Sequence, residues 1–311
     1  MKTLYLGTPE CSAYCLEFLL EEGVDIVGVV TQPDRPYGRK LTPKAPPVKE
    51  IALKHKLRLF QPERASDPEV IADLSILEPD VTVVFAFGEF LSDPFLKIPG
   101  ISTVNLHLSL LPEYRGAAPV QWAIIDGKKV TGVTTFHIVK AMDAGDIIYQ
   151  REVPIAEDDT GETLTRKLTE AGSEVMLKTI RDLYDRTAPR TQQDHSKATL
   201  ARKLKKSDGL IDWNSDSDRI HDLIRGMNPW PCAYSVWRSG DEQRILKFFS
   251  VQPSNIKGDQ PGRVLAEGDD LFVATGNGAV QVLSVQIEGK RIISGREFLN
   301  GHHAIRGALL G

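Results

Sequence analysis

The polar residues with the clearest chemical potential lie at the end of an apolar run in the middle of the chain. Asn105 and His107 are two positions apart in NLHLS, and period-2 strand geometry places both side chains on the side opposite Leu106. An amide donor beside an imidazole can hold a carbonyl oxygen that becomes negative while its carbon is attacked. The alternative is structural, with both side chains satisfying backbone groups at the strand end. The spacing alone favours this alternative.

A carboxylate that could serve the same centre comes later in the chain. Asp143 lies in MDAGD, a turn expected between two strands. It could orient the imidazole of His107 and relay the proton that leaves an attacking amine. It could equally form an Asx-turn, because Asp before small residues and Gly is ordinary turn chemistry. Asp146 competes for the role and ranks second because it opens the next strand.

Alternating strands and helices must position these residues. Apolar strands such as VTVVFAF lack the alternation of a half-exposed sheet, which indicates burial on both faces of a mainly parallel sheet. The first half of the chain therefore predicts a doubly wound, Rossmann-like α/β domain, whose ligands collect beyond the carboxyl ends of the strands. Strands are expected at residues 3–6, 26–31, 58–60, 81–85, 102–107, 133–138 and 147–154. Helices are expected at residues 13–22, 47–55, 68–77, 118–126 and 161–184.

The pattern changes after the long helix at 161–184. The following stretch is polar, contains Pro189 and carries a basic run, which predicts a linker, although a merely solvated segment explains the charge as well. Beyond a short helix at 216–226, closely spaced strands separated by Gly-rich turns predict a small antiparallel barrel. These strands are expected at residues 233–238, 244–251, 262–266, 271–274 and 280–286. We therefore predict a catalytic domain at 1–188, a basic linker at 189–207 and a second domain at 208–311.

The composition and the missing motifs disfavour several classes of protein. The chain is 41% hydrophobic and 26% charged, ordinary for a globular protein. No apolar run reaches the roughly 20 residues that span a bilayer. Three cysteines make neither a disulfide framework nor a zinc-ligand pattern. The first turn, GTPE, lacks the glycine fingerprint of dinucleotide sites. We expect a cytoplasmic protein without a metal, and the net charge of −4 argues against indiscriminate nucleic-acid binding.

Longer strings around these residues resemble the formyltransferases that use 10-formyltetrahydrofolate. In the first half the resemblance rests on TQPDRPYGRK, NLHLSLLPEYRGAAPVQWAI and TGVTTFHIVKAMDAGDII. In the second half it rests on IDWNSDSDRIHDLIRGMNPWPCAY, PGRVL, VATGNGAVQVLSVQIEGK and GREFLNG. The NPWP string and the barrel-like tail are similar to the members that modify tRNA. The resemblance covers nearly the whole chain and turns the balance at Asn105 and His107 towards catalysis.

The resemblance implies roles for particular residues. Asn105, His107 and Asp143 match the catalytic triplet of the family. The residues that match its folate-binding loops are Phe87, Gly88, Glu89, Leu91, Ser109, Leu110, Leu111 and Pro112. The residues that match its tRNA-binding positions are Arg39, Lys40, Arg202, Lys203, Lys205 and Lys206. The second domain would be an OB-fold-like barrel that grips tRNA together with the linker.

The implied activity is transfer of the formyl group of 10-formyltetrahydrofolate, a co-substrate, to the α-amine of methionyl-initiator-tRNA. It would serve translation initiation, and a monomer without a metal is expected. Three alternatives stay open: a sugar-nucleotide N-formyltransferase, a hydrolase of formyl-folate and a non-catalytic RNA-binding protein. The sequence departs from the family at Gly38–Leu41, which is shorter than the usual run, and at Glu89, where a neutral or basic residue is more familiar. Which of His107 and Asp143 holds the proton during attack is also left open.

Overall fold

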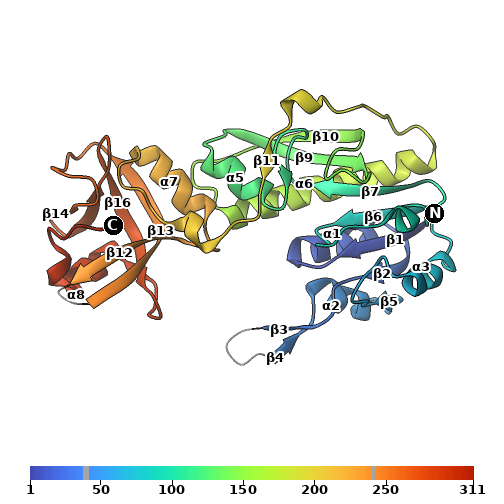
Figure 1. Ribbon diagram of the computed structural model, residues 1–311, viewed down its shortest axis with the longest axis horizontal. Coiled ribbons are helices and arrows are strands. Elements are labelled where there is room, and N and C mark those ends of the chain that lie inside the picture. The colour runs from blue at the N-terminus through green and yellow to red at the C-terminus, as the bar shows by residue number, and fades with distance from the viewer. Residues whose placement is uncertain (38–41, 240–241) are drawn as a thin grey trace. The chain divides into compact units, whose positions relative to one another are not determined.

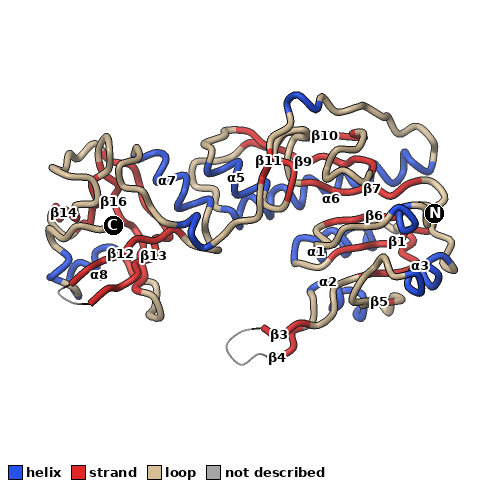
Figure 2. The backbone as a smooth tube through the Cα atoms, in the orientation of Figure 1, coloured by secondary structure: helices blue, strands red, loops and turns tan. Residues whose placement is uncertain are grey.

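The computed structural model describes residues 1–37, 42–239 and 242–311, which form two compact units (Figures 1 and 2). The first unit comprises Met1–Ala117, Val130–Pro154 and Thr165–Ala201, and the second comprises Ala118–Lys129, Ile155–Leu164 and Arg202–Gly311. The second unit therefore includes two segments that come earlier in the chain than the last segment of the first unit. The division expected at residues 188 and 207 stays a prediction about folding domains. No helix of the described residues is both long and apolar enough to cross a membrane.

The first unit is built around strands and helices that alternate along the chain. Its strands are β1 (Lys2–Gly7), β2 (Asp25–Val30), β3 (Arg35–Tyr37), β4 (Thr42–Lys44), β5 (Leu59–Phe60), β6 (Val81–Phe85), β7 (Ser102–His107), β8 (Arg115–Gly116), β9 (Val130–His137), β10 (Ile147–Pro154) and β11 (Leu200–Ala201). Its helices are α1 (Glu10–Glu21), α2 (Pro47–Lys54), α3 (Pro68–Ser75), α4 (Asp93–Leu96), most of α6 (Gly161–Tyr184) and the 3-10 turn η1 (His195–Lys197).

The main sheet of this unit is mainly parallel, as the apolar strands predict. Its seven strands run in the order β10-β9-β7-β6-β1-β2-β5. The pairs from β5 to β7 are parallel, whereas β9 is antiparallel to both β7 and β10. Every residue of β6 is buried, which explains why its sequence lacks alternation. Because β1, β6 and β7 are parallel neighbours, their carboxyl ends meet at one edge of the sheet.

The helix expected at 118–126 is present as α5 (Pro119–Ile125), but it belongs to the second unit. There Ala118, Trp122 and Ile125 pack with the apolar core of that unit, and α5 contacts α7 (Ser217–Gly226). An amphipathic pattern indicates that a helix has an apolar face and does not say which partner will cover it. Nothing in the local sequence pattern separates α5 from the helices that stay in the first unit.

The second unit is an antiparallel sheet that the C-terminal segment closes towards a barrel. The remaining elements are η2 (Lys206–Gly209), β12 (Ala233–Ser239), β13 (Glu242–Ser254), β14 (Val264–Glu267), β15 (Asp270–Ala274), β16 (Ala279–Ile287), β17 (Ile293–Ser294), α8 (Gly295–Gly301) and η3 (His303–Ile305). The strand order is β12-β13-β16-β15-β14, with β17 beside β16. Leu310 pairs with Trp237 on β12, and Leu309 pairs with Arg263 next to β14, so both edge strands gain a partner.

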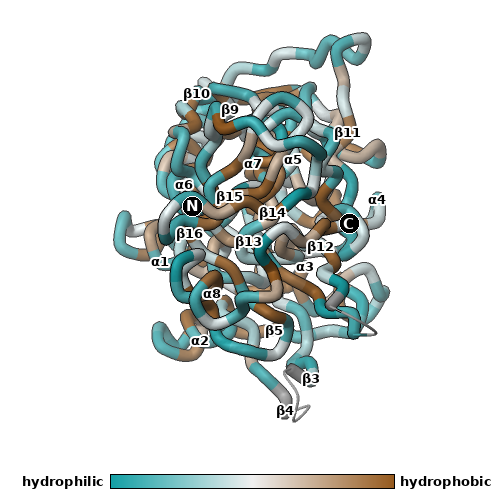
Figure 3. The backbone as a smooth tube through the Cα atoms, turned by 90° about the vertical axis from the view of Figure 1, so that its left-hand side faces the viewer, coloured by the Kyte–Doolittle hydropathy of each residue, from teal (hydrophilic) through white to brown (hydrophobic). Residues whose placement is uncertain are grey.

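Aromatic side chains fill the core of this unit. Trp213 meets Phe248 edge-to-face with ring centroids 5.5 Å apart, and Trp237 meets Phe298 of α8 in the same way at 6.2 Å. Hydrophobic stretches (brown in Figure 3) alternate with hydrophilic ones along the chain. Helix α8 was not expected, although its start carries a capping box. Ser294 accepts from the Glu297 backbone N–H at 3.1 Å, and Glu297 accepts from the Ser294 backbone N–H at 3.0 Å.

Candidate active site

Asn105 and His107 lie at the carboxyl end of β7, at the edge where the parallel strands finish. Leu106 points the other way and contacts Gly172 of α6, where an added Cβ would lie 2.9 Å from a Leu106 methyl carbon. Asn105 is partly exposed and His107 only 6% exposed. Within the described part of the chain, no hydrogen bond involves the side-chain amide of Asn105. Its N–H groups are therefore free to meet a ligand beside the imidazole.

The imidazole of His107 is fixed on one side and faces a carboxylate on the other. Its Nε2 lies 2.9 Å from the carbonyl oxygen of Tyr114. A carbonyl can only accept, so Nε2 carries a hydrogen and donates it. The Nδ1 atom then faces Asp143, whose Oδ2 is 3.8 Å away. That distance is too long for a hydrogen bond, but it is short enough to stabilise a positive imidazole.

The carboxylate of Asp143 is itself held by the backbone. Its Oδ2 accepts a hydrogen bond of 2.8 Å from the N–H of Gly116, so this carboxylate bonds across to another loop. The competitor Asp146 is turned elsewhere and forms an ion pair of 2.6 Å with Arg190. Of the two carboxylates, Asp143 is the one that lies beside His107.

Three residues around this edge hold the left-handed backbone conformation that side chains disfavour. They are Ala86 after β6 (φ 50°), Tyr114 (φ 59°) and Asp143 (φ 48°). For a residue other than glycine this conformation is held only where the surrounding structure fixes it, and such residues gather at functional sites. Asp143 tolerates it best, since Asp enters this region several-fold more often than most residues.

The loop from Phe87 to Leu91, predicted to hold folate, follows β6 at the same edge. Phe87 is buried, and its carbonyl accepts from the Thr8 hydroxyl at 3.2 Å. Glu89 turns its carboxylate to the backbone N–H of Ala65, 3.2 Å from each oxygen. The unusual acid at this position thus holds a neighbouring loop, and no direct role with a ligand is needed to explain it. Gly88 has φ 85°, a conformation suited to glycine. Leu91 packs partly buried against the core next to the loop.

The second stretch predicted to hold folate, Ser109 to Pro112, is already bonded to its surroundings. The Ser109 carbonyl accepts from Thr134 at 2.7 Å, and the Leu111 carbonyl accepts from Gln150 at 2.9 Å. The Leu110 carbonyl accepts from the Glu113 N–H at 3.1 Å, and the Pro112 carbonyl accepts from the Thr199 N–H at 3.3 Å. These bonds give the stretch its shape. Side-chain contact and the second lone pairs of the carbonyls stay available to a ligand.

The residues predicted to bind tRNA fall into two groups. Arg39 and Lys40 lie outside the described residues. The others lie in the second unit, in residues 202–208, here named the lysine segment. Lys203, Lys205 and Lys206 are exposed, whereas Leu204 between them is buried and anchors the segment.

Arg202, also predicted to bind tRNA, serves the structure of the lysine segment. Its guanidinium makes two bonds of 2.7 and 2.8 Å to Asp208 and lies 4.9 Å from the ring centroid of Trp122. Oδ2 of Asp208, which bonds to Arg202 at 2.7 Å, also accepts from the Lys205 N–H at 2.7 Å. Arg202 therefore holds the segment in place, and the three lysines present its charge.

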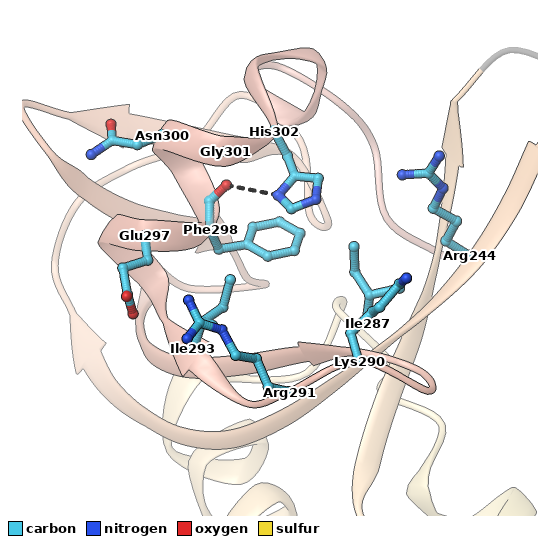
Figure 4. Close-up of a pocket in the computed structure, with 10 residues that line it drawn as sticks. All are labelled: Arg244, Ile287, Lys290, Arg291, Ile293, Glu297, Phe298, Asn300, Gly301 and His302. Atoms are coloured by element: carbon cyan, nitrogen blue, oxygen red, sulfur yellow. Dashed lines mark hydrogen bonds between the residues drawn. The ribbon is translucent and has the colours of Figure 1, made fainter.

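A cavity of about 850 Å³ lies in the second unit, and none of the residues predicted from the sequence to act lines it (Figure 4). Phe298 and His302 stack at its wall with ring centroids 4.6 Å apart, and Arg244, Lys290 and Arg291 lie around it. His302 is also bonded to the Phe298 carbonyl at 3.1 Å. Among the described residues, no cluster of His, Cys, Asp and Glu is arranged to hold a metal ion.

Local sequence patterns do not reveal the residues that hold the loops of Asp143 and Tyr114 in place. Gln193 is 4% exposed and donates to the carbonyls of Asp143 and Gly145. Thr199 pairs with the backbone of Tyr114. Both lie in the stretch predicted to be a linker, where polar composition hides them. A buried Gln leaves no trace in a local sequence pattern.

Comparison with known proteins identifies the class of this fold and site. The family model described as formyl transferase matches residues 1–180, and the model of the formyl transferase C-terminal domain matches residues 203–303. A solved structure of HypX from Aquifex aeolicus with tetrahydrofolic acid shares the fold, with TM-score 0.66 and 18% identity over 96% of this chain and 47% of that one. The N-formyltransferase of Helicobacter canadensis has TM-score 0.66 and 18% identity over 91% of this chain and 98% of its own. The chain is a formyltransferase.

Full-length relatives narrow the class. The methionyl-tRNA formyltransferase of Caldanaerobacter subterraneus is 41% identical over 100% of both chains. That of Halalkalibacterium halodurans is 42% identical over 97% of this chain and 95% of its own. The chain therefore belongs to the methionyl-tRNA formyltransferase family.

Proposed function

We propose that this protein transfers the formyl group of 10-formyltetrahydrofolate to the α-amine of methionyl-initiator-tRNA. The chemistry rests on the centre formed by Asn105, His107 and Asp143, and above all on the 3.8 Å approach of His107 Nδ1 to the Asp143 carboxylate. The choice of amine rests on the full-length relationship to methionyl-tRNA formyltransferases, which covers both units.

The proposed reaction forms one C–N bond and breaks another. The neutral amine attacks the formyl carbon, and the carbonyl electron pair moves onto the formyl oxygen. The Asn105 side chain donates an N–H hydrogen bond to this oxygen at the carboxyl edge of the sheet. A donor held in place there stabilises the developing charge more strongly than water does. The C–N10 bond then breaks. The attacking nitrogen loses one proton and N10 gains one, so the balance needs a single carrier.

His107 is the carrier that best fits the hydrogen bonds around it. Because Nε2 keeps its hydrogen for the Tyr114 carbonyl at 2.9 Å, the lone pair at Nδ1 is the one that can take a proton. The resulting imidazolium lies opposite the Asp143 carboxylate, whose Oδ2 is held by the Gly116 N–H. In this scheme His107 carries the proton, and Asp143 stabilises the charge.

A sugar amine is the chief alternative acceptor. The Helicobacter canadensis enzyme, solved with folinic acid and dTDP-3-aminofucose, shares the fold at 18% identity. The relatives at 41 and 42% identity are instead methionyl-tRNA formyltransferases. The exposed lysines of the lysine segment also suit a polyanion. Together these favour tRNA.

The deciding experiment offers the protein 10-formyltetrahydrofolate labelled in the formyl group together with one acceptor at a time. The acceptors are methionyl-initiator-tRNA, methionyl-elongator-tRNA, an amino-sugar nucleotide and water alone. We expect label on the methionine of initiator tRNA at a rate far above the other three. Preferential labelling of the sugar, or release of free formate only, would overturn the proposal in favour of a sugar transferase or a hydrolase.

The proposed activity implies where the protein acts in the cell and in which form. Its acceptor is made and used where translation occurs, so we place the enzyme in the cytoplasm. We further propose that it acts as a monomer with folate as a co-substrate and without a metal. The folate-binding role of Phe87 to Leu91 and of Ser109 to Pro112, and the tRNA-binding role of Arg39 and Lys40, belong to the same proposal.

A further inference from the structure

Residues 191–201, here named the clamp segment, are tied down at both ends beside the catalytic loops. At one end Thr191 pairs antiparallel with Ile147 at the start of β10, through bonds of 2.7 and 2.9 Å. At the other end β11 pairs parallel with β8, the two residues after Tyr114. The Tyr114 N–H donates to the Thr199 hydroxyl at 2.8 Å. A segment bonded in this way is a fixed part of the first unit.

The centre of the clamp segment reaches the turn that carries Asp143. The side-chain amide of Gln193 donates to the Asp143 carbonyl at 2.9 Å and to the Gly145 carbonyl at 2.7 Å. Its oxygen accepts from the guanidinium of Arg115 at 2.5 Å. The Arg115 guanidinium also lies 2.9 Å from Nδ1 of His195. Both N–H groups of Gln193 and its oxygen are thus in use, which is what a buried amide requires.

The turn that Gln193 holds is one that would not keep its shape alone. Asp143 has φ 48°, and an added Cβ on Gly145 would lie 1.7 Å from the His137 carbonyl oxygen. Such a backbone persists when neighbours fix it. The position of the Asp143 carboxylate opposite His107 follows directly from this backbone.

We propose that Gln193 is a positioning residue for the formyl transfer, acting through Asp143. It touches none of the atoms proposed to react, and the inference rests on the proposed function of that centre. Without its two donors the Asp143 turn relaxes and the carboxylate no longer lies opposite Nδ1 of His107. Since a displacement of about 1 Å can cost roughly 100-fold in rate, we expect kcat to fall by about 10- to 100-fold.

The variant Gln193→Met separates hydrogen bonding from packing, because Met has a similar volume and no amide. Gln192→Ala is the matched control, since Gln192 is the exposed neighbour of the same type. We expect Gln193→Met to lower kcat with little change in the KM for folate, and Gln192→Ala to leave both unchanged. Amide exchange in residues 141–146 should quicken in the Met variant only, a readout that does not depend on turnover.

A double-mutant cycle with Asp143→Asn tests the route of the effect. If Gln193 acts through Asp143, Gln193→Met should slow the Asp143→Asn enzyme by less than about twofold. An equal slowing in both backgrounds, or unchanged exchange at 141–146, would overturn the proposal. The cycle is measured with whichever amine the wild-type protein formylates, so an error in the proposed acceptor leaves this test intact.

Discussion

The clamp segment and the lysine segment follow one another along the chain, and both are polar, yet they are built in opposite ways. In the clamp segment Gln193 is buried, and its side-chain amide is fully bonded to the Asp143 turn and to Arg115. In the lysine segment Lys203, Lys205 and Lys206 are exposed, and one buried leucine anchors them. Polar groups that are buried and paired fix geometry, whereas exposed charges bind and steer a charged partner. We expect changes near the first to act on kcat and changes in the second to act on tRNA binding.

The largest effect should follow from loss of the centre that the clamp segment serves. Replacing Asn105 or His107 by Ala removes the side chain proposed as the oxyanion donor or as the proton carrier. Each should lower kcat by about 1,000-fold, as the loss of one such donor or base does elsewhere. Initial-rate measurements with saturating folate and tRNA give the ratio of wild-type to variant kcat, and thermal unfolding shows whether the variants stay folded. Near-normal turnover in both would remove the centre from this edge.

The next largest effect should come from the lysine segment, and it should change the KM for tRNA and leave kcat as it is. Replacing Lys203, Lys205 and Lys206 together by Ala should raise the KM for tRNA by about tenfold or more, because phosphate contacts supply sequence-independent affinity. The dependence of log KM on log salt should become shallower by up to about three. Turnover at saturating tRNA should be unchanged.

A matched triple variant checks that the effect belongs to this segment. Lys56, Lys97 and Lys257 are exposed lysines at other places in the chain, and their replacement by Ala changes the net charge by the same amount. We expect little change in KM there. Equal weakening in both triple variants would show a diffuse effect of charge and would end the contrast between the two segments.

A smaller effect should follow from loosening the lysine segment without removing its charges. Arg202 beside Asp208 holds the pKa of that carboxyl below its ordinary value. Asp208→Asn weakens both the bond to Arg202 and the bond from the Lys205 N–H. We expect the melting temperature to fall by a few degrees and the tRNA KM to rise by about two- to threefold, corresponding to less than about 1 kcal/mol. Unchanged values of both would show that the lysines need no anchor.

The smallest effect concerns pH and a histidine next to the Asp143 loop. Burial, and then the positive charge of Arg190, lowers the pKa of His137 below its ordinary value of 6.5. The unfolded chain therefore binds a proton more readily than the folded one, and stability is lost as pH falls through 6.5 towards the lowered value. We expect the melting temperature to drop between pH 7.5 and 5.5, and to drop less in His137→Gln. Equal drops would mean that other groups govern the loss.

In the first unit, the features that depend on a few neighbouring residues, such as buried strands and the directions of strand side chains, could be predicted from the sequence. Uninterrupted apolar runs marked buried parallel strands, and β6 lies where it was expected. Period-2 geometry placed Asn105 and His107 opposite Leu106, which packs on α6. The capping box of Ser294 and Glu297 is likewise a local signal, and it marks the start of α8. In each case the signal spans only a few residues.

Contacts between segments that are far apart in the chain could not be predicted from local sequence patterns. Nothing local shows that α5 packs in the second unit or that Leu309 and Leu310 pair with the two edge strands. Glu89 stood out as an unfamiliar acid, and only the bond to Ala65 explains it. Arg202 carries the same charge as the lysines, and only the structure shows its contacts with Asp208 and Trp122. Its role in tRNA binding stays a prediction.

By itself, the sequence determined the class of fold, the strand end that carries Asn105 and His107, and the family to which the chain belongs. Only the tertiary structure decided which carboxylate lies opposite His107, which imidazole nitrogen keeps its hydrogen, and which buried amide holds the Asp143 turn. The physical reason is separation along the chain: Gln193 bonds a carbonyl 50 residues away. Periodicity records which face of an element is buried, and the fold alone selects the partner that meets it there.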